Sequence, residues 1–164
     1  MGQRRRCAYR QGTAPPRGLT YMDDSDLVES RLSAICQEMA ELEPRERLEL
    51  LLDFSENMPE LPQKYAEERD QGLHRVHECQ TPVFIWIEEV KNRCQVFSYV
   101  APEAPTVKGF VAILSQILFN SRREDIQSLP PNLIQRLGLA EALGMIRARG
   151  LAGIVNYIQR LAKN

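Results

Sequence analysis

The stretch VFIWIEEVKNRCQVFSYV, residues 83–100, decides the fold class of this chain. Its first half is rich in β-branched and aromatic residues, and Val83, Ile85 and Ile87 alternate so that they share one face of a strand. The polar KNR segment that follows is typical of a turn, after which residues 94–100 return as a second strand. The stretch therefore predicts an antiparallel β-hairpin.

Helical patterns flank this hairpin on both sides. On the N-terminal side we expect helices over 25–42 and 44–55, the second one starting at Pro44, which suits a first helical turn. Residues 56–72 are charged and interrupted by turn signals, so they predict a connector, and residues 73–76 predict a short strand.

Beyond the hairpin, apolar residues recur with a period near 3.6 from residue 106 to 118, which predicts a long helix. Short helices are expected at 123–129 and 131–137, then a turn near 140–148, and a last helix from about Gly150. The order of elements predicts an α+β fold, with a small antiparallel sheet packed against N-terminal and C-terminal helices.

Charge is distributed unevenly along the 164 residues. Residues 1–21 contain five arginines and no acidic residue, which leaves 16 basic against 22 acidic residues, a net charge of −6, for residues 22–164. An acidic body argues against a nucleic-acid partner, since such proteins gather Lys and Arg. No run of about 18 apolar residues exists, so the sequence predicts no membrane span.

The domain organisation follows from the same contrast. Residues 1–21 are basic and almost free of aliphatic residues, which predicts a disordered tail, with a transit peptide or a nucleic-acid arm as alternatives. Residues 22–164 are long enough to form one domain around one core. Because the chain has no apolar stretch typical of a secretory signal, we expect a cytoplasmic protein with free cysteines.

The segment HRVHECQTPVFIW, residues 74–86, holds both histidines and one of the four cysteines. His74, His77 and Cys79, with Cys94, offer the ligand types of a zinc site, but their spacing matches no zinc pattern. A Cys–His hydrolase would need a third, orienting group that the sequence does not place. The residues alone therefore lead to an accessible loop thiol at Cys79, whose basic neighbour Arg75 favours the thiolate.

Three motifs carry a resemblance to a known family. They are RVHECQTPVF (75–84), VKGFVAIL (107–114) and LIQRLGLAEALGMIRARGLAGIV (133–155). In this order they resemble the SufE family of sulfur-acceptor proteins, which includes its CsdE relatives. The resemblance implies that Cys79 receives a persulfide sulfur from a cysteine desulfurase, a pyridoxal-phosphate enzyme, and relays it to iron–sulfur scaffold proteins. It implies desulfurase activation by transpersulfidation and no cofactor bound to this chain.

Further residues acquire roles from this resemblance and from its mechanism. His77 is expected to assist proton transfer, and an apolar shelter for the persulfide is expected from Phe84, Trp86 and Phe110. The residues expected to support the loop or contact the partner are Glu78, Gln80, Thr81, Glu103, Lys108 and Arg147.

The chain departs from the family pattern at several of these positions. Glu78 stands where the family has glycine, Thr81 where it has serine and Phe84 where it has tryptophan. If the carboxylate of Glu78 lies close to Cys79, it should disfavour the thiolate.

Two other functions remain open from the sequence. The first is a non-catalytic protein-binding module in which Cys79 is incidental or redox-regulatory. The second is a metal-binding regulator that uses His74, His77 and Cys79.

Removal of residues 1–21 should leave the thermal unfolding temperature unchanged, because this segment offers no pattern that could add to a core. Thermal unfolding of the full and shortened chains, followed by circular dichroism, checks the prediction. A clear drop in the unfolding temperature of the shortened chain would contradict it.

Overall fold

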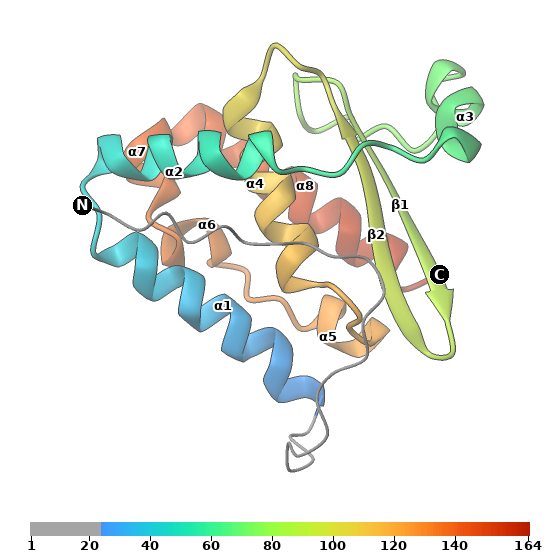
Figure 1. Cartoon of the computed structure of the whole chain (residues 1–164), viewed down its shortest axis with the longest axis horizontal. Helices are drawn as coiled ribbons and strands as arrows, with labels where there is room; N and C mark the ends of the chain where they lie inside the picture. The colour runs from blue at the N-terminus through green and yellow to red at the C-terminus, as the bar shows by residue number, and fades with distance from the viewer. Residues whose placement is uncertain (1–23) are drawn as a thin grey trace.

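The computed structural model describes residues 24–164, and side chains from residue 27 onward. Helices α1 (Asp24–Ala40) and α2 (Pro44–Glu56) come first, followed by the 3₁₀ turn η1 (Gln63–Tyr65) and the short helix α3 (Ala66–Asp70). Strands β1 (Val83–Val90) and β2 (Arg93–Val100) follow. The C-terminal half contains α4 (Pro105–Ile117), α5 (Arg123–Gln127), α6 (Leu133–Arg136), α7 (Leu139–Leu143) and α8 (Met145–Leu161). This is the α+β fold that the sequence predicts (Figure 1).

The predicted hairpin is confirmed. β1 and β2 pair antiparallel from Val83 opposite Val100 to Val90 opposite Arg93, so the turn contains only two residues. Both of them, Lys91 and Asn92, have positive φ angles of 52° and 60°. Two such residues make a hairpin turn whose twist matches that of the strands.

The two faces of the hairpin lie against different parts of the chain. Val83 and Ile85 point into the main core, which also contains residues of α1, α2, α4 and α8. Phe84 and Trp86 point the other way and form a second cluster with Tyr65 of η1. Figure 1 shows α3 on this outer side of the hairpin, away from the other helices. A strand buried on both faces explains why 83–87 reads as an uninterrupted apolar run.

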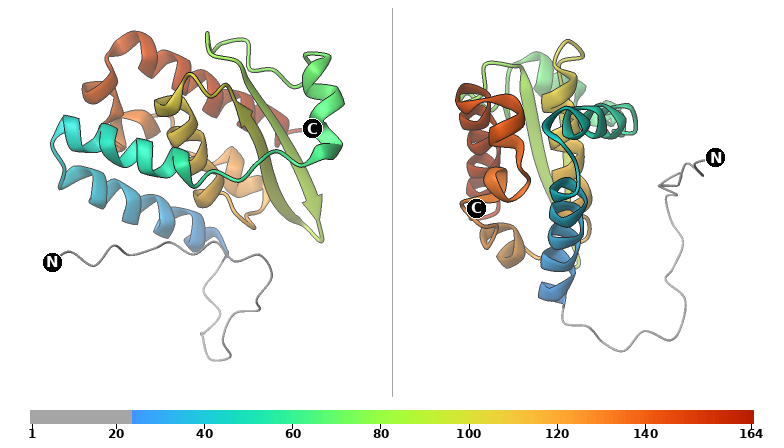
Figure 2. Two further views of the ribbon diagram at one scale, coloured as in Figure 1. Left: turned by 45° about the horizontal axis from the view of Figure 1, so that its top comes forward. Right: turned by 90° about the vertical axis from the view of Figure 1, so that its left-hand side faces the viewer.

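The helices form layers around α4. The right-hand view of Figure 2 shows α4 and the hairpin between α2 on one side and α7 and α8 on the other. α4 is the most deeply buried helix, since every residue from Gly109 to Leu114 is buried. Among the described residues, no helix is both long and apolar enough to cross a bilayer.

Two arginines connect helix ends that lie far apart in the sequence. The guanidinium of Arg31 on α1 donates to the carbonyl oxygens of Ile117 and Phe119, at 3.1 and 2.6 Å, and so satisfies the C-terminal end of α4. Arg47 on α2 donates to the carbonyl oxygens of Met39 and Gly138, at 2.9 and 3.2 Å. The N-terminal helices are thereby joined to the C-terminal half.

Three sequence-based expectations are corrected. The connector 56–72 contains η1 and α3, because Tyr65 packs on Trp86 and so orders this polar segment. The strand expected at 73–76 is reduced to one bridge between Arg75 and Phe84. The turn expected near 140–148 is replaced by α7 and by the first turn of α8, which starts at Met145 rather than near Gly150. This start was missed in the sequence because Met145 and Ile146 are exposed and do not extend the apolar stripe of the helix. The predicted tail, residues 1–21, lies outside the described residues.

Helices α2 and α4 approach each other so closely that only glycine fits at residue 109. A Cβ atom added to Gly109 would lie 2.0 Å from the carbonyl oxygen of Leu51. Since that oxygen belongs to the backbone of α2, a side chain cannot be accommodated by a rotamer change.

Gly109→Ala should therefore lower the free energy of unfolding by about 3 kcal/mol or more, because the two helices must separate. Urea denaturation measures this change, and Gln116→Ala on the same helix, whose side chain is only half-buried, is the matched control. Equal denaturation midpoints for wild type and Gly109→Ala would show that the helices do not cross this closely.

Candidate functional site

Cys79 lies in a short turn between the Arg75–Phe84 bridge and strand β1. The backbone amide of Val76 donates to the carbonyl oxygen of Val83 at 2.8 Å, which closes the base of the turn. Inside the turn, the amide of Cys79 donates weakly to the carbonyl oxygen of Val76 at 3.4 Å. Residues 77–82 form no regular secondary structure. They are thus a small unit attached to the sheet at its base.

The thiol of Cys79 points inward. His77, Glu78 and Gln80 are exposed, whereas Cys79 has only 5% of its surface accessible and belongs to the main core cluster. The expectation of an accessible thiol is therefore wrong for this conformation. The physical reason is packing: in a polar turn, the one side chain that gains by leaving water is the small, weakly polar thiol.

Helix α8 provides the surface against which the turn rests. A Cβ atom at Gly150 would lie 3.8 Å from the Sγ atom of Cys79, an ordinary contact. A Cβ atom at Gly153 would lie 2.5 Å from the Cβ of Glu78, which is too close. Glycine at 153 therefore permits the turn to lie directly on the helix.

Glu78 turns away from the thiol and pairs with α8. Its Oε1 atom accepts a hydrogen bond from Nη2 of Arg160 at 2.5 Å. Burial raises the pKa of Glu78, but hydrogen bonds from its own backbone amide and from Arg160, with the charge of His77, outweigh burial and lower that pKa overall. The carboxylate is thus ionised and paired with the guanidinium of Arg160.

The apolar shelter is only partly as expected. Phe110 on α4 belongs to the same core cluster as Cys79. Phe84 and Trp86 belong to the second cluster, on the outer face of the hairpin, so they do not shelter the thiol. The period of two along β1 is the reason, since Val83 and Ile85 take the inward positions and their neighbours must face outward.

The remaining predicted residues differ in their exposure. Thr81 is half-buried in the turn, Lys108 is half-buried on α4, and Glu103 and Arg147 are exposed near the starts of α4 and α8. Within residues 27–164, no hydrogen bond or ion pair connects the last three side chains to the Cys79 turn. Their predicted roles toward a partner stay predictions.

The described residues contain no group of three or more His, Cys, Asp or Glu side chains that could hold a metal ion. His74, a candidate ligand in the sequence, instead lies 3.5 Å from Oε2 of Glu68 and packs beside Trp86, with ring centroids 5.4 Å apart. His74 and Cys79 therefore lie in different surroundings, and the zinc arrangement is not formed.

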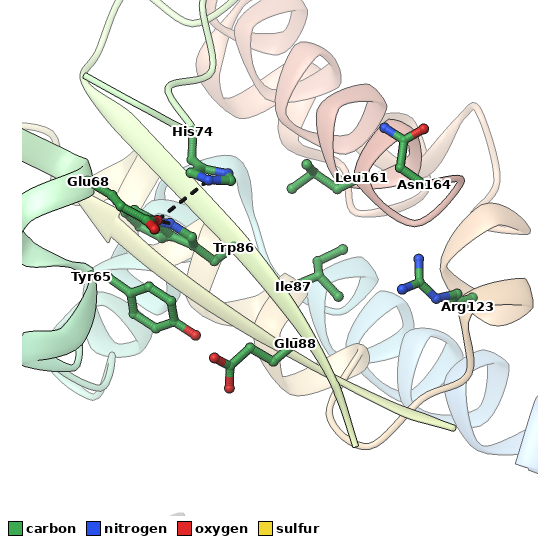
Figure 3. A pocket seen from close by; sticks show the side chains of 9 residues that line it. All are labelled: Tyr65, Glu68, His74, Trp86, Ile87, Glu88, Arg123, Leu161 and Asn164. Carbon is green, nitrogen blue, oxygen red and sulfur yellow. Dashed lines mark hydrogen bonds and ion pairs between the residues drawn. The ribbon is translucent and has the colours of Figure 1, made fainter. Parts of the chain in front are cut away.

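A pocket of about 360 Å³ lies elsewhere, along strand β1, where it is lined by residues of both faces of the strand and by the end of α8. It is bordered by His74, Glu68 and Trp86 at one end and by Arg123 and Asn164 at the other (Figure 3). Trp86 donates its indole N–H to Glu68 at 2.6 Å, which fixes α3 to β1. Cys79 does not line this pocket, so the thiol and the pocket are separate features.

The fold and the site define a small α+β protein that carries one buried cysteine in a turn resting on a helix. The family model SufE, described as an Fe-S metabolism associated domain, matches residues 33–162. The chain belongs to this family.

Relatives extend over most of the chain. SufE-like proteins from two strains of Mycobacterium tuberculosis, both named uncharacterized, are 32% identical over 130 residues, 79% of this chain and 89% of theirs. A protein of Plasmodium falciparum named cysteine desulfuration protein SufE is 31% identical over 107 residues, 63% of this chain and 41% of its own length.

A solved structure has the same fold. The solution structure of a hypothetical protein from Thermus thermophilus superposes with a TM-score of 0.70 at 28% identity, covering 81% of this chain and 93% of that one.

Sequence reasoning missed the helix face that receives the turn. Gly150, Gly153, Tyr157 and Arg160 follow spacings of three, four and three, which place them on one face of α8. This spacing is visible in the sequence. The segment that packs on this face cannot be read from the sequence, because the Cys79 turn lies far away along the chain, before the hairpin and α4.

Gly153→Ala should make Cys79 more accessible, because the new methyl group would displace the turn from α8. Site-resolved alkylation by iodoacetamide, followed by peptide mass spectrometry, should show faster modification of Cys79. Gly150→Ala is the control, since its methyl group makes an ordinary contact with Sγ. Equal rates in the wild type and both variants would contradict the close approach at Gly153.

Proposed function

We propose that this chain accepts a persulfide sulfur from a cysteine desulfurase on Cys79 and relays it to iron–sulfur cluster assembly. Membership of a family associated with iron–sulfur metabolism supports this role, as does the relative named as a cysteine desulfuration protein. The observation that carries the proposal is the place of Cys79. Cys79 lies in the middle of a turn whose two ends are joined to the sheet by the Val76–Val83 hydrogen bond. It is also the cysteine of the motif 75–84, which resembles the cysteine motif of the family.

The transfer is a thiol exchange without net oxidation. The thiolate of Cys79 attacks the terminal sulfur of a persulfide on the desulfurase cysteine, a new S–S bond forms on Cys79, and the old S–S bond breaks. The desulfurase cysteine leaves as a thiolate and is free for another turnover. In this way the acceptor raises the desulfurase rate, whereas the pyridoxal phosphate that releases sulfur from cysteine belongs to the partner.

Burial of the thiol imposes a requirement on this step. An Sγ atom with 5% of the residue surface accessible cannot meet a sulfur atom inside another protein. The turn must therefore swing outward when the partner binds, and its base at Val76 and Val83 is the natural hinge. Between transfers, the inward position keeps the persulfide among core residues and away from water and oxidants.

His77 and the exposed charges complete the proposal. His77 is exposed two residues before Cys79, where its imidazole can take the thiol proton once the turn is released. Gln80, Glu103 and Arg147 are exposed and Lys108 is half-buried; we assign them to contact with the desulfurase.

The burial of Cys79 also favours a second candidate, a non-catalytic protein-binding module in which this cysteine merely fills space. A buried cysteine that packs like a small apolar residue is common. The two functions differ in one respect that can be measured, since only the first one places a sulfur atom on Cys79.

Incubation with a cysteine desulfurase and L-cysteine should raise the intact mass of the wild-type chain by one sulfur atom, located on Cys79 by peptide mapping. Cys79→Ser should lose this modification and the activation of the desulfurase. Since a hydroxyl replaces a thiol in the core, the free energy of unfolding should fall by about 1–3 kcal/mol.

Cys94→Ser is the matched control, because Cys94 is fully buried in the same core cluster. It should lose similar stability and keep sulfur acceptance, and Cys36→Ser should also keep it. An unmodified wild-type chain, with a desulfurase that is shown to be active, would favour the binding module. Modification of Cys94 in place of Cys79 would refute the assignment of the acceptor.

A further inference from the structure

The Cys79 turn is held against α8 by one ion pair at a position where the family pattern has glycine. Glu78 precedes Cys79 directly, and its carboxylate accepts the hydrogen bond from Arg160 at 2.5 Å. Both side chains are partly exposed, at 41% for Glu78 and 53% for Arg160. The pair therefore lies at the surface, at the outer edge of the contact between turn and helix.

The face of α8 that contacts the turn contains two glycines, which allow a close approach. Gly150 and Gly153 leave room for Sγ of Cys79 and for Cβ of Glu78. One turn further on, the guanidinium of Arg160 stacks over the ring of Tyr157 at 5.5 Å from its centroid. The ring restrains the guanidinium, so less side-chain entropy is lost when Arg160 pairs with Glu78.

Moving the thiol outward must break this pair. Glu78 and Cys79 are adjacent in the chain, so the turn cannot carry Sγ away from Gly150 while the Glu78 backbone stays against Gly153. Release of the turn thus separates the two charges, and the free energy of release includes the strength of the pair.

We infer that Glu78 and Arg160 are positioning residues, which hold Cys79 in its buried position and set how often the turn opens. The inference deepens the proposed function and rests on it, because it concerns the thiol between transfers. A surface pair of this kind stabilises by up to about 1 kcal/mol, so its loss should raise the open fraction about two- to fivefold. This differs from a direct effect of Glu78 on the reactivity of the thiolate.

Two variants separate these explanations by the sign of their effect. If the pair holds the turn, Glu78→Gln and Arg160→Gln should each speed alkylation of Cys79 about two- to fivefold. If the charge of Glu78 acted on the thiolate directly, Glu78→Gln would still speed alkylation. Arg160→Gln would slow it, because it removes the cation that offsets the carboxylate.

The measurement uses the full-length chain, neutral iodoacetamide and peptide mass spectrometry to follow each cysteine separately. Cys94 is an internal reference, because it is fully buried and reacts only when the core opens. Lys163→Gln is the matched control, an exposed cation after the last turn of α8. It should leave the rate at Cys79 unchanged.

Salt and charge reversal provide two readouts that a merely structural role would not change. Raising the ionic strength should speed alkylation of Cys79 in the wild type, but not in the two single variants, because salt weakens an exposed pair. The double variant Glu78→Arg with Arg160→Glu should restore slow alkylation.

Wild-type rates in both single variants would overturn the inference, as would equal acceleration of Cys79 and Cys94. The assay contains no desulfurase, so its outcome is independent of sulfur acceptance. A chain that fails to form a persulfide and still shows these rates would refute the proposed function and leave the ion pair in its positioning role.

Discussion

The first half of β1, Val83–Trp86, is buried on both faces, and the surrounding elements are arranged to cover it. Its inward residues Val83 and Ile85 join the core that unites α1, α2, α4 and α8. Its outward residues Phe84 and Trp86 are covered by Tyr65 of η1, and Glu68 of α3 accepts a hydrogen bond from Trp86. Because β1 is fixed from both sides, the turn that directly precedes it, residues 77–82, has a defined position beside α8. The Cys79 turn owes its position to this arrangement.

The turn combines a fixed base with a weakly attached tip. At the base, the Val76–Val83 hydrogen bond continues the pairing of the sheet. At the tip, the turn is attached by the burial of the small Cys79 side chain, by contacts with the glycines of α8 and by a surface ion pair. Hydrogen bonds of a sheet open together with the core, whereas a surface pair and a few contacts open locally at much lower cost. The proposed sulfur transfer requires this difference, because it needs Cys79 to be shielded between transfers and exposed during them.

The departures from the family pattern acquire a physical meaning in this context. A carboxylate at residue 78 need not disturb the neighbouring thiol, because Glu78 is exposed and pairs with Arg160 whereas Cys79 is buried. Phe84 packs in a cluster that does not contain Cys79, so its replacement of the family tryptophan concerns the packing of η1 and α3 rather than the thiol.

The sequence by itself determined the α+β class, the hairpin, the alternation along its first strand and the long helices, because these follow from local periodicity, and its short motifs singled out Cys79 as the candidate. It did not determine that Cys79 is buried, that Arg160 receives Glu78, or that Tyr65 orders the connector before the sheet. Each of these depends on two segments distant in the chain meeting in space. Only the tertiary structure decided them, because a side chain's burial and its charge partner depend on packing between elements, on which the local pattern carries no information.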